Sequence, residues 1–451
     1  MKSIFWATLC MAAVAVGLAS ETRAADQLAL SVSPVQKTLD ADKKGNTWVR
    51  VELVGAEQAA DEKRAPVNLA IVLDRSGSMG GEKIKRAKEA AINAVGQLGP
   101  NDIVSIVAYD SVVTTLVPAT KLTDVKSVIE EIRSIEVGGS TALFAGVSKG
   151  AAEVRKFSDK EHVNRVILLS DGLANIGPSS AGELASFGES LVKENISVST
   201  FGLGLGYNED LMSQLASNSG GNHLFVEDAE VLADAFRREF DDVLSVVAQE
   251  VDIQVTIPDG IRPVRVLGNN SDIVGQQVVS RLAQVYSQQQ RFILIEVEVP
   301  ASKTGSTREL ASVAVAYANM STNRGDKLSG SSKVNFSDNK SSVSESVDKD
   351  VMADVVTLVS SEQTKLATKY LDEGDLIKCQ EALQSNVDYL RANALVCPSD
   401  KDRLERLADD NFERIIEVES VKTKNDVYWS RARKNLRGYQ QENDLQQRVK
   451  R

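Results

Sequence analysis

Apolar residues along the chain change their spacing twice, which divides the sequence into regions of different architecture. From Gln27 to Leu53, and again from Val251, apolar and polar residues alternate, as expected of strands with one buried face. Between Pro66 and about Val247, unbroken apolar runs of strand length alternate with helical patterns. From Val351 onward the apolar spacing is three or four residues, which is typical of helices that bury one face.

The central region, residues 66–247, predicts a doubly wound α/β domain, because alternating β and α units form a mainly parallel sheet with helices on both faces. Ala229 to Val247 is expected to be its closing helix. The expected strands are Val67–Leu73, Ile103–Tyr109, Val166–Leu169, Val198–Leu203 and His223–Val226, with an antiparallel edge strand within Asp110–Pro118.

The alternating regions on either side, residues 25–62 and 250–336, are expected to form one β-sandwich. Two strands alone are marginally stable, and the termini of an inserted domain usually lie close together, so the N-terminal pair should join the later strands. Residues 337–350, rich in serine and charge, are expected to form a linker.

Residues 351–451 predict a helical domain. An antiparallel hairpin of helices 351–371 and 376–396 should be followed by helices 403–421 and 427–436. Cys379 and Cys397 fall on one helical stripe, and a continuous helix would hold them about 27 Å apart, so no disulfide is expected between them. The basic segment 431–451 is interpreted as a solvated helix face, with contact to an anionic lipid surface as the alternative.

The N-terminus has the form of a secretory signal peptide, residues 1–24, with Lys2, an uncharged run and small residues Thr22 and Ala24 before the cleavage point. Cleavage after Ala19 and an uncleaved membrane anchor are alternatives. No later apolar run approaches the ~18 residues that a membrane span needs. We therefore expect an exported protein, periplasmic or secreted and associated with a bacterial cell envelope, without an integral membrane span after cleavage.

Composition fits a soluble globular chain, with 42% hydrophobic and 25% charged residues over 451 positions. The formal net charge of −11 argues against a nucleic-acid partner, because that affinity depends on neutralising phosphates with lysine and arginine. His162 and His223 are the two histidines and are expected to be ordinary surface or turn residues.

Polar oxygen side chains occur at two strand ends and in one glycine turn of the predicted α/β domain. Asp74, Ser76 and Ser78 come directly after the first strand, Thr141 lies in a glycine turn before a helix, and Asp171 ends a later strand. Ligands of open α/β sheets bind beyond the carboxyl ends of the strands, where all five would lie. Carboxylate and hydroxyl oxygens suit Mg²⁺ or Ca²⁺. The sequence thus predicts a cation site.

These three fragments, Asp-x-Ser-x-Ser, Gly-Gly-Ser-Thr and Ser-Asp-Gly in that order, resemble the von Willebrand factor type A family. The resemblance implies that Asp74, Ser76, Ser78, Thr141 and Asp171 form the family's metal-ion-dependent adhesion site. It further implies that the remaining coordination position accepts an Asp or Glu from a partner protein. The flanking strands resemble those of bacterial relatives of inter-α-trypsin-inhibitor heavy chains and of calcium-activated-channel-like proteins.

Three other interpretations remain open. The polar residues could merely cap helices and make turns. The metal could only stabilise the loops of a structural component of an envelope complex. Ser78, Asp171 and His223 occur in the order of an α/β-hydrolase triad, although a hydrolase would not explain Thr141. The favoured hypothesis is a non-enzymatic, metal-dependent interaction protein.

Overall fold

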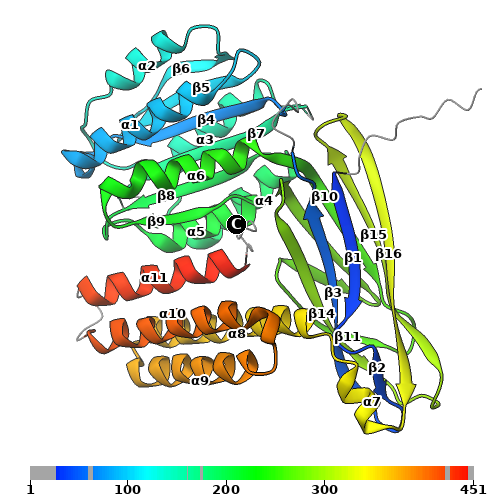
Figure 1. Ribbon diagram of the computed structural model, residues 1–451. Helices are drawn as coiled ribbons and strands as arrows, with labels where there is room; N and C mark the ends of the chain where they lie inside the picture. The colour runs from blue at the N-terminus through cyan, green and yellow to red at the C-terminus, as the bar shows by residue number, and fades with distance from the viewer. Residues whose placement is uncertain (1–26, 59–63, 160, 173–175, 422–426, 445–451) are drawn as a thin grey trace, which may run out of the picture.

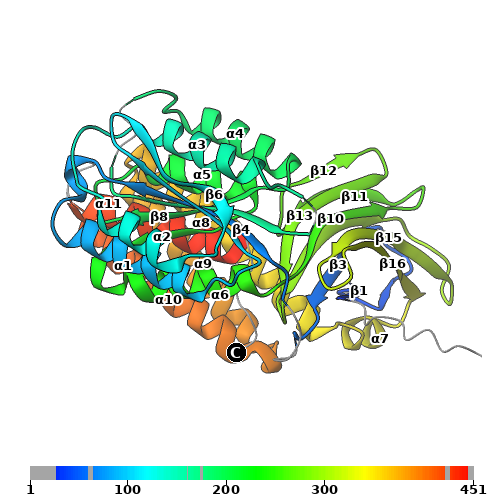
Figure 2. The ribbon, with the colours of Figure 1, turned by 90° about the horizontal axis from the view of Figure 1, so that it is seen from above.

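The chain folds into an α/β domain, a β-sandwich and a helical domain, seen in a computed structural model that describes residues 27–58, 64–159, 161–172, 176–421 and 427–444. The sandwich lies on one side of the α/β domain, and the C-terminal helices lie along another (Figures 1 and 2). The predicted signal peptide, residues 1–24, lies outside the described residues. Within the described ranges, no helix has both the length and the apolar composition needed to cross a bilayer.

The sheet of the α/β domain has the strand order β6-β5-β4-β7-β8-β9, in which only β6 is antiparallel to its neighbour. Helices α1, α2 and α6 cover one face, and α3, α4 and α5 cover the other (Figure 1). The strands are β4 (Val67–Asp74), β5 (Ile103–Tyr109), β6 (Val113–Lys121), β7 (Val163–Ser170), β8 (Ser197–Leu203) and β9 (His223–Val226). The helices are α1 (Glu82–Gln97), α2 (Val125–Arg133), α3 (Leu143–Arg155), α4 (Ala181–Lys193), α5 (Glu209–Ser219) and α6 (Leu232–Leu244).

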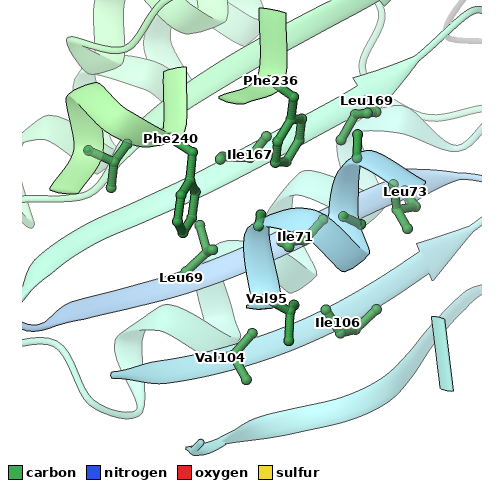
Figure 3. Close-up of a cluster of buried hydrophobic side chains, with 14 of the residues drawn as sticks. Leu69, Ile71, Leu73, Val95, Val104, Ile106, Ile167, Leu169, Phe236 and Phe240 are labelled. Atoms are coloured by element: carbon green, nitrogen blue, oxygen red, sulfur yellow. The ribbon is translucent and has the colours of Figure 1, made fainter. Parts of the chain in front are cut away.

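Strand β4 is buried over all eight of its residues, because both of its faces are covered. Leu69 and Ile71 pack with Phe236 and Phe240, which point from α6 toward the sheet (Figure 3). Val72, on the opposite face, belongs to the cluster formed with α3, α4 and α5. This is why the strand reads as one continuous apolar run rather than an alternating one.

The β-sandwich combines strands from both sides of the α/β domain, as the sequence pattern suggested. Its first sheet has the order β1-β3-β14-β11, and its second has the order β12-β13-β10-β15-β16-β2. Their inner faces share one apolar core. The strands are β1 (Leu28–Pro34), β2 (Thr38–Asp40), β3 (Gly45–Gly55), β10 (Val246–Thr256), β11 (Arg262–Leu267), β12 (Ser271–Val274), β13 (Gln277–Tyr286), β14 (Gln290–Val299), β15 (Thr307–Asn319) and β16 (Arg324–Ser337).

Two segments differ from the sequence-based expectation. The closing helix α6 ends at Leu244, because Val246 and Val247 enter strand β10 and the sandwich. The segment predicted as a linker contains helix α7 (Lys340–Glu345), whose first N–H groups are capped by the side chain of Asn339.

The helical domain consists of α8 (Lys349–Glu373), α9 (Leu376–Ala394), α10 (Lys401–Glu419) and α11 (Val427–Asp444), packed around a shared core. Gly374 ends α8 in the left-handed conformation, which gives the sharp turn of the hairpin. Cys379 and Cys397 are buried free thiols. The predicted absence of a disulfide agrees with this, although Cys397 lies beyond α9, which runs from Leu376 to Ala394, and is not on the same helix as Cys379.

The basic C-terminal segment is not a solvated face, which corrects the sequence-based interpretation. Arg433 and Lys434 of α11 form ion pairs with Glu209 at the start of α5. Lys434 also donates to the carbonyl oxygen of Tyr207 at 2.7 Å, and its side chain is buried. Helix α11 thereby attaches the helical domain to the α/β domain beside β9 (Figure 1). Residues 445–451 lie outside the described residues.

The sandwich is attached through Arg165, the third residue of β7, whose side chain is fully buried. Its guanidinium donates to Ser199 Oγ at 2.8 Å within the α/β sheet. It also donates to Gln284 Oε1 at 2.5 Å and to the Tyr286 hydroxyl at 3.0 Å, both on β13 of the sandwich. Glu239 of α6, 3.5 Å away, supplies the opposite charge that a buried guanidinium requires.

His223 is a buried residue of β9, and the prediction that it is a surface or turn residue is wrong. Its ring nitrogens lie 2.8 Å from Thr200 Oγ1 and 3.2 Å from the Tyr207 hydroxyl. Burial, together with the nearby charge of Lys434, lowers the pKa of His223 to about 3.

This burial predicts an acid-sensitive stability. The unfolded chain takes up a proton at His223 below about pH 6.5, whereas the folded chain does so only near pH 3. The free energy of unfolding should therefore fall as the pH falls through that window, by up to about 1.4 kcal/mol per pH unit from this group. Urea unfolding at pH 7 and pH 5 should show a smaller pH dependence in His223→Gln than in the wild type.

His162→Gln is the matched control, because His162 pairs with Asp159 near the surface at 2.7 Å. Equal pH dependence in the wild type and His223→Gln would contradict the assignment.

Candidate metal centre

The structure brings all five predicted oxygen side chains together at the carboxyl end of the α/β sheet. Asp74 ends β4, the strand between β5 and β7, and Asp171 directly follows β7. Ser76 Oγ lies 3.1 Å from Ser78 Oγ, which donates to Asp171 Oδ1 at 2.7 Å. Thr141 is adjacent, since a Cβ built on Gly172 would lie 2.8 Å from Thr141 Oγ1.

Backbone hydrogen bonds join the loop after β4 to the glycine turn that carries Thr141. The Gly138 N–H donates to the Arg75 carbonyl oxygen at 2.8 Å, and the Gly77 N–H donates to the Gly139 carbonyl oxygen at 3.2 Å. Gly139 has a φ of +71°, and a Cβ there would lie 2.9 Å from Ser111 Oγ. Only glycine satisfies both requirements, which explains its use in this turn.

Asp74 is fully buried, and burial raises the pKa of its carboxyl group above the ordinary value. Two hydrogen bonds oppose that shift: Ser170 Oγ donates to Asp74 Oδ2 at 2.6 Å, and the Ser76 N–H donates to Asp74 Oδ1 at 2.8 Å. The charge of Asp171 adds to the upward shift. Two carboxylates in one poorly solvated place are stabilised by a cation between or beside them.

Three supporting residues were not identified from the sequence. Ser170 orients Asp74, as described above. Tyr109 ends β5 directly opposite Asp74 in the parallel register, and its buried hydroxyl has a pKa raised well above the ordinary value by burial and by the charge of Asp74. Lys83, in the first turn of α1, donates to Asp171 Oδ2. The first two could have been found from strand register, because both are the last residues of their strands.

The donor set fits a hard divalent cation. It consists of two carboxylates and three hydroxyls, all oxygen, without the sulfur or imidazole that softer metals prefer. The described part of the chain contains no group of three or more His, Cys, Asp or Glu side chains placed to hold a metal. A metal here would therefore depend on the serine and threonine hydroxyls.

The hydrolase arrangement is not formed. Ser78 does contact Asp171, but both ring nitrogens of His223 are bonded to Thr200 and Tyr207 inside the domain. The histidine therefore cannot take a proton from Ser78 in this structure.

Comparison with known proteins identifies the domain: residues 68–238 match the family model of the von Willebrand factor type A domain. The chain thus contains a domain of this family, whose members are commonly non-enzymatic protein-interaction modules, often with a divalent cation at the metal-ion-dependent adhesion site. The chain is 23% identical over 332 residues to an uncharacterised Synechocystis protein, covering 71% of this chain and 78% of that protein.

Human inter-alpha-trypsin inhibitor heavy chain H3 is 26% identical over 37% of this chain, but the match covers only 20% of that protein. Among solved structures, a von Willebrand factor type A protein from Catenulispora acidiphila aligns over 92% of this chain and 96% of its own, with a TM-score of 0.70 and 14% identity. The ArnB paralog VWA2 from Sulfolobus acidocaldarius aligns over 91% and 98%, with a TM-score of 0.62 and 18% identity. These likenesses show that the overall fold is shared.

The close approach of Gly172 to Thr141 yields a test of the site. Gly172→Ala would push its new methyl group against Thr141 Oγ1, 2.8 Å away, and displace that oxygen from the others. We expect roughly tenfold weaker Mg²⁺ binding in isothermal titration, which corresponds to about 1.4 kcal/mol. Gly138→Ala is the matched control, because a Cβ there meets nothing within 4 Å. Equal losses in both variants would show that Thr141 has no special part in binding.

Proposed function

We propose that this protein is an exported interaction protein whose type A domain binds an exposed Asp or Glu of a partner protein through Mg²⁺ or Ca²⁺. The observation that supports it most strongly is the convergence of Asp74, Ser76, Ser78, Thr141 and Asp171 at one sheet edge. The three contributing fragments are far apart in the sequence, so ordinary helix capping and turn formation do not account for their meeting.

The side chains of this site would hold the cation with oxygens that carry little charge. Asp74 and Asp171 supply two formal negative charges, and the three hydroxyls supply none. When bound, the cation would act as a Lewis acid that accepts one further oxygen ligand. Ser78 is exposed at the surface, so the position beside it is open to a partner's side chain.

Export is proposed from the N-terminal sequence. Lys2, the uncharged run after it and the small residues Thr22 and Ala24 form a secretory pattern. The compartment would be the periplasm or the exterior. The acidic balance of the chain, −11, disfavours nucleic acid as the partner.

The second candidate function is that of a structural component of an envelope complex, in which the metal only stabilises the loops of the type A domain. The observation that favours it is that the buried charged groups Arg165 and Lys434 attach the sandwich and the helical domain to the α/β domain. Buried contacts of this kind between domains are expected in a rigid structural component. In that case the partner would contact the sandwich or the helical domain.

Cation binding is the first measurement. Isothermal titration of the chelator-treated chain with Mg²⁺ and Ca²⁺ should give saturable binding that is lost in Asp74→Ala and reduced at least about tenfold in Thr141→Ala. Asp272→Ala is the matched control, because Asp272 is an exposed carboxylate on β12 of the sandwich. Binding that survives in Asp74→Ala would contradict the site.

Carboxylate binding is the second measurement. Acetate added to the Mn²⁺-loaded protein should displace a metal-bound water and lower the water proton relaxation enhancement in the wild type. The structural alternative expects instead that Asp74→Ala lowers the unfolding midpoint and that acetate has no effect on the relaxation of the wild type.

A further inference from the structure

Lys83 is the feature of the metal centre that neither the donor set nor the fold explains. Its ammonium donates to Asp171 Oδ2 and lies 3.5 Å from the carbonyl oxygen of Ser78. The side chain of Asp171 is buried, whereas about a third of the Lys83 side chain is exposed. One of the two carboxylates of the site therefore already carries a positive partner supplied by the chain itself.

The helix on which Lys83 stands does not favour this position. Lys83 lies in the first turn of α1, where the positive end of the helix dipole repels a cation. The acidic residue of that turn, Glu82, is directed to Lys85 and Arg86, each at 3.5 Å. The carboxylate of Asp171, facing α1 from the end of β7, is what stabilises Lys83 there.

The end of the Lys83 side chain passes beside the loop after β8. A Cβ built on Gly204, in the loop after β8, would lie 3.7 Å from both Cε and Nζ of Lys83. That distance is an ordinary van der Waals contact, so the loop borders the lysine without obstructing it. Asp171 Oδ1 is turned the other way, toward Ser78, at 2.7 Å. The two oxygens of Asp171 thus have different roles: Oδ2 pairs with Lys83, and Oδ1 faces the hydroxyls.

We propose that Lys83 is a specificity-determining residue of the site, which lowers its affinity for the cation and raises its affinity for the partner's carboxylate. This inference rests on the proposed function. With Lys83, the two carboxylates and one ammonium sum to −1, so that a divalent cation leaves the site at +1. Without Lys83, the same site would be neutral once loaded. An incoming Asp or Glu is attracted to the first site more strongly than to the second.

The test compares Lys83→Met with Lys85→Met in the full-length, chelator-treated chain. Both variants remove one positive charge from the first turns of α1, but Lys85 pairs with Glu82 rather than with a residue of the metal centre. Lys83→Met should bind Mg²⁺ about tenfold more tightly than the wild type in isothermal titration. The same variant, loaded with Mn²⁺, should need about tenfold more acetate to reverse the water proton relaxation enhancement. Lys85→Met should match the wild type in both measurements.

Each outcome separates this inference from the proposed function. Equal Mg²⁺ and acetate affinities in Lys83→Met and the wild type would overturn the role of Lys83 and leave the cation site intact. Weaker Mg²⁺ binding in Lys83→Met would also overturn it, since Lys83 would then support the site. If only Lys83→Met bound Mg²⁺, the role of Lys83 in opposing the cation would be supported, whereas the proposed function of the wild type would fail. If neither bound, both would fail.

Discussion

The burial of β4 on both faces is the constraint on which the rest of the structure depends. A strand covered by helices on each side has little access to water, and apart from Asn68 its residues before Asp74 are apolar, so polar side chains gather at its carboxyl end. Asp74 stands there and is itself buried, with Ser170 and the Ser76 N–H directed at its two oxygens. A carboxylate held in this way remains costly until a cation approaches it. The fold thus buries a negative charge that the proposed metal would stabilise.

Much of this could be predicted from the sequence, because it depends on local pattern. The continuous apolar run of β4 and the polar residues after it follow from a doubly covered parallel strand, and the carboxyl ends of such strands meet at one edge. The strand ends alone place Asp74 and Asp171 side by side, and the glycine turn before α3 adds Thr141. Their place at one edge is therefore a consequence of topology, while the binding of a metal there remains a proposal.

The sequence-based predictions that the structure corrects have a different cause. Each concerns a residue whose contacts come from elements far apart in the chain. The sequence around Arg433 and Lys434 predicts a solvated face, because their carboxylate partner, Glu209, is more than 200 positions away. His223 was expected at the surface because nothing in its neighbourhood of the sequence announces that α11 covers β9. Lys83 was overlooked for a similar reason, since its target belongs to another strand. Pairings of this kind are decided by the assembled fold rather than by spacing.

The two attachments of the α/β domain differ in their distance from its proposed metal edge, which bears on how the proposed docking could work. Arg165 joins the sandwich near the start of β7, and Asp171 follows the end of the same strand. At about 3.3 Å per residue, these two points are about 20 Å apart. Helix α11 packs against β9, and its Lys434 bonds to Tyr207 and Glu209, in the loop after β8 and at the start of α5. This loop lies beside Asp171, since a Cβ built on Gly206 would lie 3.2 Å from the carbonyl oxygen of Asp171. The sandwich therefore holds the α/β domain at the end of the sheet opposite the proposed metal edge, whereas the helical domain is attached beside that edge, so a partner that docks there would lie close to α11.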